Sequence, residues 1–318
     1  MGVGHMNSPK QLTILTPIFE NRAASKFLFA DLFEKFGAAC FVVAVDDGSV
    51  RDPVEKSDLQ EQGLNGVVIR LRRNVGHQRA IAVGLNYVAD HRPDYPCVVM
   101  DSDGEDRVAT IELLQDELDE QQLDAVVAAR KSRVASVTFR VFYVFYTLLF
   151  GLMTGQSIRF GNFMILSPKG IKRLVAMNEL WIHIAACLLA SKLRVKNLSI
   201  ARGPRYSGQS KMNFSSLALH GLRAFMVFAE QVLVRVGIAC AAISVLSVIG
   251  MFASVSLKFM GLATPGWFSI SLGVMLLVLL QTGALTLMSL MMTGIIRDRS
   301  QATIEYQDLI DDVLKTNA

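Results

Sequence analysis

Two long stretches almost without charge, residues 236–257 and 267–296, constrain this chain more than any other feature of its sequence. A helix needs about 20 apolar residues to cross the hydrocarbon layer of a bilayer, and each stretch is long enough. The link between them is short and contains Gly261, Pro265 and Gly266, which favour a turn. We therefore predict a hairpin of two transmembrane helices, joined to whatever the rest of the chain folds into.

The charges beside these stretches predict the side of the membrane on which the rest of the chain lies. Arg235 precedes the first stretch, Arg297 and Arg299 follow the second, and Lys258 lies in the link. Because basic residues concentrate on the cytoplasmic side, both ends of the hairpin and the large remaining region are expected in the cytosol.

The composition of the chain further restricts its expected partners and its compartment. Apolar residues make up 52% of the chain and charged residues 19%, and the net charge of +4 gives no indication of a nucleic-acid partner. Residues 1–9 are expected to be a cloning remnant outside the fold. The cysteines are too far apart in sequence for a metal knuckle, and we expect buried thiols in a reducing compartment. They are Cys40, Cys97, Cys187 and Cys240.

The region before the hairpin alternates strand and helix signals. This alternation predicts an α/β fold, with a mostly parallel sheet covered by helices on both faces. In such sheets, ligands bind beyond the carboxyl ends of the strands. Apolar runs predict strands at 12–15, 41–45, 67–71, 97–100 and 125–129, and helical spacing predicts helices at 23–36, 77–89 and 108–121.

Polar clusters follow three of these strands, and we expect them to line one crevice at the carboxyl edge of the sheet. The carboxylates of the second cluster could accept hydrogen bonds from a base or a ribose, although aspartate and glycine also favour turns that end strands. The clusters are Glu20-Asn21, Asp46-Asp47 and Asp101-Ser102-Asp103.

The third cluster is the central feature. Asp101 and Asp103 are two carboxylates on a turn that leaves a sheet, and such a pair can hold Mg²⁺ or Mn²⁺ against a diphosphate. Glu105 follows closely and could complete the metal's ligands. His77 is a possible base, but we interpret it as a residue that begins a helix.

Two apolar segments precede the hairpin. Residues 139–153 are rich in aromatic side chains but too few to span a bilayer, so we favour an interfacial helix over a buried core helix. Residues 214–234 carry Arg223 and Glu230 among apolar residues and predict an amphipathic helix leading into the membrane. The tail from Arg297 onward is expected to be a short exposed helix.

These interpretations divide the chain into four regions after the first nine residues. They are an α/β domain at 10–212, a juxtamembrane amphipathic helix at 213–235, two transmembrane helices at 236–297 and a cytosolic tail at 298–318. The α/β domain includes the interfacial helix near 134–154.

Four motifs, in order and at similar spacing, resemble those of family 2 glycosyltransferases. They are residues 17–22, Val45-Asp46-Asp47-Gly48-Ser49, Asn74-Val75-Gly76-His77-Gln78-Arg79-Ala80 and Met100-Asp101-Ser102-Asp103. Within that family the chain is similar to the polyprenyl-phosphate sugar synthases, the group of dolichol-phosphate mannose synthase and bactoprenol glucosyltransferases. The similarity rests on residues 205–211, which match that group's R-x-x-G-x-S-K element.

The resemblance implies a GT-A fold and inverting transfer of a sugar from a nucleotide diphosphate sugar, UDP favoured over GDP, to a polyprenyl phosphate. It assigns the nucleotide sugar to Pro17, Glu20, Asn21, Asp46, Asp47 and Asp101, and the metal, Mg²⁺ or Mn²⁺, to Asp101, Asp103 and Glu105. It assigns the lipid phosphate to Arg130, Arg205, Ser210 and Lys211, and the catalytic roles to Asp101, Asp103, Arg205 and Lys211.

The chain departs from the family at two places. The family often reads Asn-Glu where this chain has Glu20-Asn21, so either residue could contact the nucleotide. The family often has glutamine where this chain has Glu105, and a carboxylate there would bind a metal more tightly than an amide.

The resemblance also implies a multi-pass protein of a bacterial inner or plasma membrane with a cytosolic catalytic domain. It implies cell-envelope glycan modification and a homo-oligomer, a tetramer in this group. The alternatives are an enzyme of the same fold that extends a lipid-linked glycan, and a non-catalytic membrane scaffold. Two spans disfavour the first, and the intact Asp101, Asp103, Arg205 and Lys211 disfavour the second.

Overall fold

The computed structural model describes residues 11–130, 137–157, 160–201, 203–206, 214–299 and 305–316. The chain forms two compact units. The first comprises residues 1–141, 158–227 and 304–318, and the second comprises residues 142–157 and 228–303.

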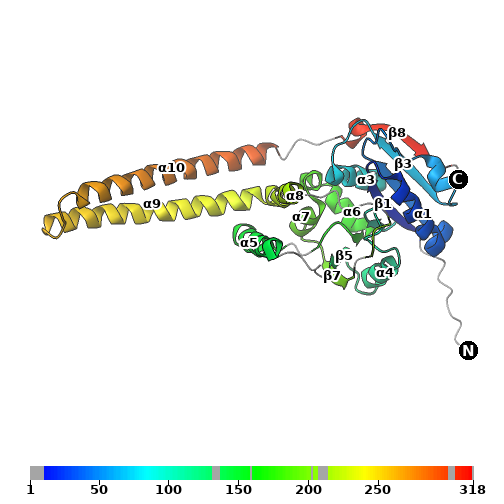
Figure 1. Cartoon of the computed structure of the whole chain (residues 1–318), viewed down its shortest axis with the longest axis horizontal. Helices are drawn as coiled ribbons and strands as arrows, with labels where there is room; N and C mark the ends of the chain where they lie inside the picture. The colour runs from blue at the N-terminus through cyan, green and yellow to red at the C-terminus, as the bar shows by residue number, and fades with distance from the viewer. Residues whose placement is uncertain are drawn as a thin grey trace, which may run out of the picture. The chain divides into compact units, whose positions relative to one another are not determined.

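The first unit is built on one eight-stranded sheet of order β7-β5-β6-β4-β1-β2-β3-β8 (Figure 1). Its centre is parallel: β1 pairs with both β2 and β4, and β2 pairs with β3. All five predicted strands are confirmed. They are β1 (Leu12–Ile18), β2 (Cys40–Asp46), β3 (Asn65–Leu71), β4 (Cys97–Val99) and β5 (Ala125–Arg130).

Two strands that the sequence did not indicate extend this sheet on the β4 side. β6 (Met164–Leu166) pairs antiparallel with both β4 and β5, and β7 (Val195–Ile200) pairs parallel with β5. β6 is only three residues long, and β7 is half-buried with two exposed positions, so neither produces a clear apolar run.

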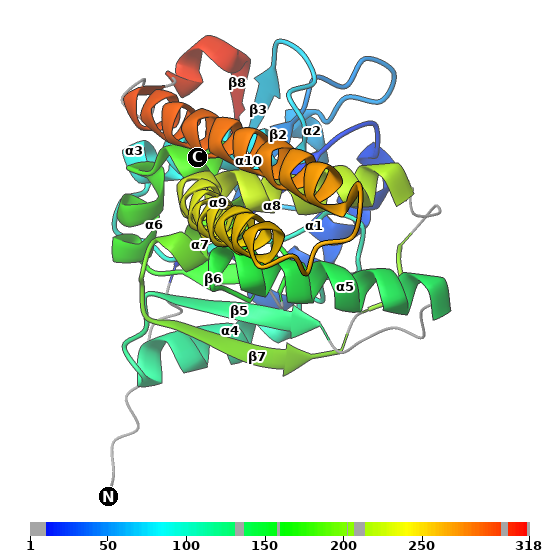
Figure 2. The same cartoon turned by 90° about the vertical axis from the view of Figure 1, so that its left-hand side faces the viewer.

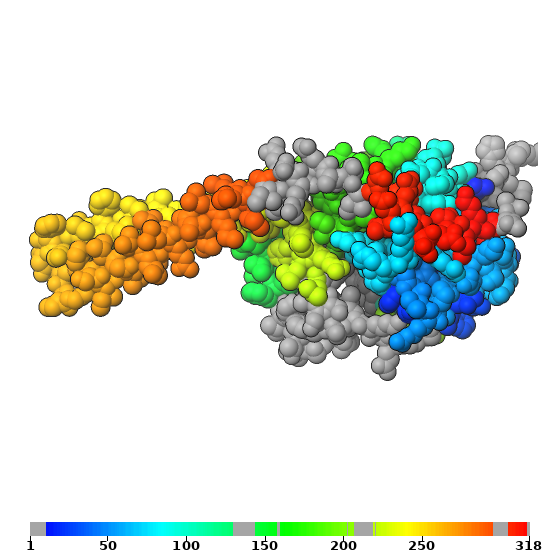
Figure 3. Space-filling view, turned by 90° about the horizontal axis from the view of Figure 1, so that it is seen from above, coloured from blue at the N-terminus to red at the C-terminus, as the bar shows by residue number. Residues whose placement is uncertain are grey.

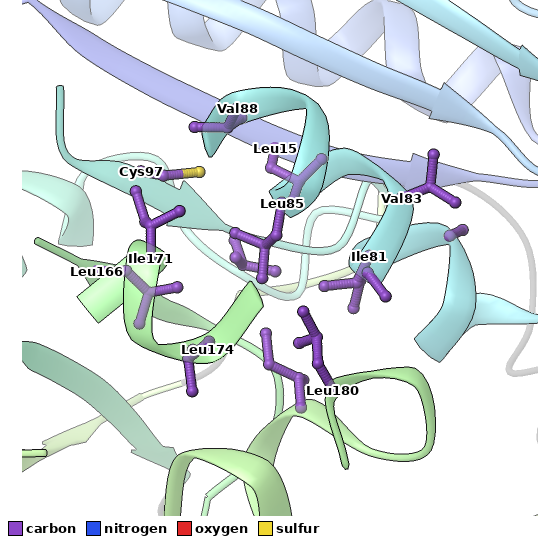
Figure 4. Close-up of a cluster of buried hydrophobic side chains, with 14 of the residues drawn as sticks. Leu15, Ile81, Val83, Leu85, Val88, Cys97, Leu166, Ile171, Leu174 and Leu180 are labelled. Carbon is purple, nitrogen blue, oxygen red and sulfur yellow. The ribbon is translucent and has the colours of Figure 1, made fainter. Parts of the chain in front are cut away.

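Helices cover both faces of the sheet and create two hydrophobic clusters. Successive side chains of a strand point to opposite faces, so Leu15 of β1 packs in one cluster and Ile14 in the other. Figure 4 shows the first cluster, in which Leu85 of α3 lies near Leu15 and Ile81 of α3 lies near Leu180. Gly84 allows this close packing, because a Cβ there would lie 2.2 Å from Leu15 Cδ1.

The predicted helices are confirmed as α1 (Arg22–Phe36), α3 (His77–His91) and α4 (Thr110–Glu120). Shorter elements connect the strands, and α8 (Phe214–Val227) follows β7. The shorter elements are η1 (Gly37–Ala39), α2 (Lys56–Gln60), α6 (Pro168–Val175), η2 (Asn178–Trp181) and α7 (Ile184–Ala190). All four cysteines are buried, as the sequence predicts.

The tail prediction is wrong. η3 (Tyr306–Leu309) leads into β8 (Ile310–Lys315), which pairs antiparallel with β3 and forms the edge of the sheet. Figure 3 shows this segment, in red, against the N-terminal part of the domain. An edge strand presents unpaired N–H and C=O groups, and β8 satisfies those of β3. Tyr306 is buried, and its hydroxyl donates to Asp90 Oδ2 over 2.6 Å.

The second unit contains two long antiparallel helices, α9 (Ala229–Phe259) and α10 (Trp267–Arg299), which lie side by side in Figure 2. Among the described residues, these are the two helices long and apolar enough to cross a membrane. Hydroxyls join them: Ser244 Oγ lies 2.6 Å from Thr282 Oγ1, and Ser254 Oγ lies 2.8 Å from Ser271 Oγ. The predicted helical hairpin is thus present.

The amphipathic segment predicted at 214–234 is divided in the structure. α8 ends at Val227 and α9 begins after Phe228, whose backbone is not helical. Glu230 lies in the first turn of α9, where a negative charge stabilises the positive end of the helix dipole.

The aromatic segment forms α5 (Val137–Thr154). Phe150 is buried and packs edge-on against Phe228, and Arg235 Nη1 donates to Leu152 O over 2.5 Å. Much of the helix beyond residue 143 nevertheless exposes apolar side chains, with Phe145 62% and Leu148 70% exposed. This exposure disfavours the core-helix alternative.

Candidate active site

The carboxyl ends of β1, β2 and β4 bring the three predicted polar clusters to one edge of the sheet. Ile18 of β1 lies beside Asp46 in the register, and the Asp47 N–H donates to Ile18 O over 2.8 Å. The Met100 N–H donates to Leu15 O at the end of β4. The three clusters therefore lie at one edge of the sheet, as the sequence predicts.

Both aspartates at the end of β2 are buried and accept hydrogen bonds from backbone N–H groups. Asp46 binds its own loop, with Oδ1 accepting from Ser49 N and Oδ2 from Val54 N, each over 2.8 Å. Asp47 accepts from Val75 N over 2.7 Å and from Gly76 N over 3.0 Å. Burial raises the pKa of Asp47, against the opposing effect of these two donors.

Gly48 makes the junction between these loops possible. Its φ is +71°, and a Cβ there would lie 2.5 Å from the carbonyl carbon of Arg73. Only glycine fits both the left-handed conformation and the close approach of the two backbones. Asp47 and Gly48 thus hold the loop before α3 against the loop after β2.

The cluster after β1 contacts the same region. The Glu20 carboxylate accepts from the N–H groups of residues 50, 51 and 52, and these bonds lower the pKa of Glu20. The Ser49 hydroxyl accepts from Glu20 N over 2.9 Å. Asn21 is half-exposed and makes no capping bond to α1, while Pro17 is buried within β1. Glu20 therefore holds the loop after β2 through its carboxylate.

The turn after β4 concentrates acidic side chains. Asp106 Oδ2 accepts from Asp101 N over 2.9 Å, and Asp103 Oδ1 accepts from Glu105 N over 3.0 Å. Burial raises the pKa of Asp103, and the negative charge of Asp101 acts in the same direction. Gly104, with φ +90°, allows the chain to turn back within the cluster.

Arg205 lies directly on this acidic turn. Its Nη2 is 3.1 Å from Asp103 Oδ2, and its Nε is 3.1 Å from Glu105 Oε1. The guanidinium therefore bridges two carboxylates that lie two residues apart. The sequence predicted that Arg205 contributes to the site, and the structure brings it to residues of the metal prediction.

Backbone hydrogen bonds hold the Arg205 segment in place. Gly203 N donates to Glu105 O, and Tyr206 N donates to Asp103 O, each over 2.9 Å. The Tyr206 hydroxyl donates to Asp31 Oδ2 over 2.5 Å. A Cβ on Gly104 would lie 2.6 Å from the Tyr206 ring, so that ring packs directly on the turn.

A second polar network contacts Asp101. His77 Nε2 lies 3.2 Å from Asp101 Oδ1 and 2.9 Å from Asn162 Nδ2. Gln78 Nε2 donates to Asn162 Oδ1, and Gln78 Oε1 accepts from Ile184 N. Desolvation lowers the pKa of His77, but the charge of Asp101 and the contact with it outweigh that effect, so the pKa is raised.

Asn162 was missed by the sequence analysis. It lies 85 positions from His77 along the chain, and only the fold brings the two together. His183, which the sequence left without a role, is buried and caps α7 by accepting from Ala186 N. The contact between His77 and Asp101 gives His77 a place at the site beyond that of a residue that begins a helix.

The acidic turn fits a hard divalent cation. Within the described residues, no three His, Cys, Asp or Glu side chains gather into a metal-holding group, so Asp101, Asp103 and Glu105 do not converge on one point. Mg²⁺, however, is usually held by one or two carboxylates together with substrate phosphates and water. Carboxylate oxygens on one turn at the crevice are suitable ligands for such a shared shell.

The residues predicted for the lipid phosphate are only partly described. Arg130 is the last residue of β5, and Arg205 lies on the acidic turn. Ser210 and Lys211 lie outside the described residues. Four predicted site residues, Asp101, Asp103, Glu105 and Arg205, are thus brought together. Glu20 and Asp47 lie on the loops after β1 and β2, and Asp46 is the last residue of β2.

A mostly parallel α/β sheet with an acidic turn after a central strand is typical of enzymes that bind nucleotides. Residues 13–171, half of the chain, match the model of glycosyl transferase family 2. The chain belongs to this family. No match was found among the curated proteins.

Solved structures support the fold. One is glucosyl-3-phosphoglycerate synthase from Mycobacterium tuberculosis in complex with Mn²⁺, UDP-glucose and phosphoglyceric acid, at a TM-score of 0.50 and 11% identity, covering 70% of this chain and 80% of that one. The same enzyme with Mn²⁺, UDP and glucosyl-3-phosphoglycerate gives a TM-score of 0.51 at the same identity and coverage. The first unit therefore has the GT-A fold.

A complex of the same enzyme with Mg²⁺ and UDP has a TM-score of 0.48 and 11% identity, and it covers 70% of this chain and 79% of that one. Mn²⁺ thus occurs with UDP-glucose or UDP in the two structures at TM-scores of 0.50 and 0.51.

Proposed function

We propose that this glycosyltransferase transfers a sugar from a nucleotide diphosphate sugar, most suitably a UDP-sugar, to a polyprenyl phosphate at a membrane. The observation that carries the proposal is the position of Arg205, 3.1 Å from both Asp103 and Glu105. Arg205 opens the R-x-x-G-x-S-K element, so its contact with carboxylates that would hold the donor's metal supports a role for Arg205 in binding the acceptor phosphate.

On the donor side, Asp101 and Asp103 would hold Mg²⁺ or Mn²⁺ together with the diphosphate. The cation neutralises the charge that develops on the departing nucleoside diphosphate. The chain's own part is to orient these two carboxylates. Asp106 fixes the backbone of Asp101, and the Glu105 N–H fixes the Asp103 side chain. The loops held by Asp46, Asp47 and Glu20 would receive the nucleoside.

On the acceptor side, the phosphate oxygen of the lipid would attack the anomeric carbon in line and invert its configuration. A phosphate monoester has a second pKa of about 6, so it is largely dianionic at pH 7 and needs no general base. Arg205 and Lys211, with Arg130 and Ser210, would bind this dianion. The forked guanidinium suits two phosphate oxygens, and the lysine acts as a point charge.

The first unit also contains a helix suited to a membrane surface. In α8, Leu219, Leu222 and Met226 are 58%, 58% and 62% exposed. Their spacing of three and four residues places them along one side of the helix, and such a stripe favours the boundary between headgroups and acyl chains. The lipid phosphate would be presented at that depth.

The acceptor proposal predicts the effect of removing the lysine. Lys211→Ala is expected to reduce transfer to undecaprenyl phosphate about 100-fold in neutral detergent, because one charge-stabilising contact to the dianion is lost. Binding of the UDP-sugar should be unchanged. The assay uses a panel of UDP- and GDP-sugars with radiolabelled sugar and the full chain.

Lys172→Ala, on α6, is the control for loss of a lysine charge. If Lys211→Ala transferred normally in neutral detergent, the lysine would serve anionic lipid headgroups instead, and its acceptor role would be rejected. If no nucleotide sugar of the panel supported transfer by the wild type, the polyprenyl phosphate itself would be rejected as acceptor.

The proposed topology has α9 and α10 crossing the membrane with the GT-A domain in the cytosol of a bacterium. The chain leaves the domain after α8 and returns to it in β8, which pairs with β3. A chain that leaves and re-enters one domain crosses the membrane an even number of times. This argument is independent of the arginines at the ends of the hairpin.

Labelling tests this topology. Thr264→Cys, in the link between the two helices, is expected to react with a membrane-impermeant maleimide added to intact cells, and Val50→Cys only after lysis. Val50 is 86% exposed, so failure to react would reflect location, and the four native cysteines are buried. Labelling of Val50→Cys from outside would contradict the proposed side.

A further inference from the structure

Arg205 occupies the place at which a divalent cation would neutralise the acidic turn. Its side chain bridges Asp103 and Glu105, whose own side chains are 19% and 3% exposed. Carboxylates withdrawn from water this far require a counter-charge, and removing the partner of a buried charge is costly. The guanidinium provides that charge.

A metal on Asp103 would compete with the guanidinium of Arg205. Arg205 already contacts Asp103 Oδ2, Oδ1 accepts from Glu105 N, and two cations on one carboxylate would repel at a separation of a few ångströms. Withdrawal of Arg205 would therefore favour binding of a divalent cation and a diphosphate at Asp103.

The backbone around Arg205 would stay in place during this exchange. Gly203 N and Tyr206 N bond to the carbonyl oxygens of Glu105 and Asp103, and the Tyr206 ring stacks on Phe27 with centroids 5.9 Å apart. The contacts that fix the segment use backbone groups and the Tyr206 side chain. The Arg205 side chain takes no part in these contacts, so it can rotate while its Cα remains beside the turn.

We infer that Arg205 is the resident counter-cation of the metal site and is released toward the acceptor phosphate when the metal and the donor bind. The second half of this inference rests on the proposed function. The exchange makes the acceptor site dependent on the donor: without metal and diphosphate, the guanidinium is held by Asp103 and Glu105, and after their arrival it becomes available to a phosphate monoester. Acceptor phosphate then binds after the donor.

The first test measures binding of Mn²⁺ alone, without nucleotide or lipid, to the full chain in detergent. Free Mn²⁺ is followed by electron paramagnetic resonance. Arg205→Gln is expected to bind Mn²⁺ about tenfold more tightly than the wild type, which corresponds to ~1.4 kcal/mol, because the internal competitor is gone. Arg205→Lys should give an intermediate affinity, since an ammonium is a point charge and cannot bridge both carboxylates as a fork does.

Arg107→Gln is the control for loss of a nearby positive charge. Arg107 is exposed and lies two residues from Glu105, and its removal should leave the Mn²⁺ affinity within about twofold of the wild type. Equal affinity in the wild type, Arg205→Gln and Arg205→Lys would overturn the counter-cation role. Using both Arg205→Gln and Arg205→Lys keeps the test valid if one of these variants folds poorly. Circular dichroism would reveal such a folding defect.

The second test uses farnesyl phosphate as a soluble probe in calorimetry. The wild type is expected to bind it more tightly with Mn²⁺ and UDP present than without them, and Arg205→Gln should lose that gain. Equal binding under both conditions by the wild type would overturn the exchange. The Mn²⁺ measurement uses no acceptor, so its result would stand even if the lipid-phosphate proposal were wrong. Failure of the counter-cation role and failure of the acceptor proposal can therefore be distinguished.

Discussion

Asp103→Asn is expected to lower the rate of sugar transfer about 10³-fold, because a carboxylate that faces the departing diphosphate becomes neutral. The amide oxygen can still accept the hydrogen bond from Glu105 N, which the Asp103 carboxylate accepts over 3.0 Å in the structure. The turn should therefore keep its shape, and the thermal unfolding midpoint should change little. Initial rates with saturating nucleotide sugar and polyprenyl phosphate measure the effect.

The matched control is Asp116→Asn, an exposed aspartate on α4 that should leave the rate unchanged. Removing divalent cations with EDTA should silence the wild type, and adding Mn²⁺ or Mg²⁺ should restore it. Full transfer by the wild type in a metal-free buffer would contradict the proposed use of Asp103.

Asp58→Asn should destabilise the GT-A domain by about 3–5 kcal/mol, the usual cost of removing one partner from a buried ion pair. The Asp58 side chain is fully buried, and its carboxylate binds Arg22 Nε at 2.7 Å and Lys26 Nζ at 3.0 Å. It also accepts from Glu55 N over 2.9 Å, which caps α2. Asparagine would leave Arg22 without this carboxylate partner and Lys26 with only the exposed Glu61.

The same group predicts a dependence on pH. Burial alone would raise the pKa of Asp58, but the hydrogen bonds and charges of Arg22 and Lys26 outweigh it and lower the pKa. A lowered pKa in the folded state means that the stabilisation is complete above the unfolded value, about 3.9, and is lost as the pH falls through the folded value. Acid should therefore destabilise the wild type more steeply than Asp58→Asn.

Thermal unfolding followed by circular dichroism between pH 7 and pH 3 measures both effects. Glu61→Gln is the control, because Glu61 is 58% exposed and its contact with Lys26 at 3.4 Å should contribute less than about 1 kcal/mol. Equal stability of Asp58→Asn and the wild type at pH 7 would refute the importance of the buried pair.

The sequence predicted the parts of the fold that leave a strong local signal. β1 to β5 each contain an apolar run, because central strands are buried on both faces and need apolar side chains throughout. β8 has no such run: Asp311 and Asp312 are adjacent in it and both exposed. Its pairing with β3 joins residues far apart in the chain, so no local sequence pattern predicts it.

The same distinction applies to the candidate site. Asp101, Asp103 and Arg205 were predicted to act in one site because each lies in a motif, and the structure places Arg205 against Asp103. The bridge from Arg205 to Glu105 was not predicted, since charge pairing depends on which loops meet. Asn162 lies in no motif, so its contact with His77 became visible only in three dimensions.

Because β8 pairs with β3, the sheet can be completed only after the segment that follows α10 has been synthesised. A ribosome makes residues 229–299 before residues 310–315, so β3 remains an open edge while both long helices are being synthesised. Open edges are templates for pairing with other chains, and this one closes only when the segment after α10 arrives. A polypeptide that stops before residue 310 keeps that edge exposed, so chains interrupted late in translation should aggregate through β3.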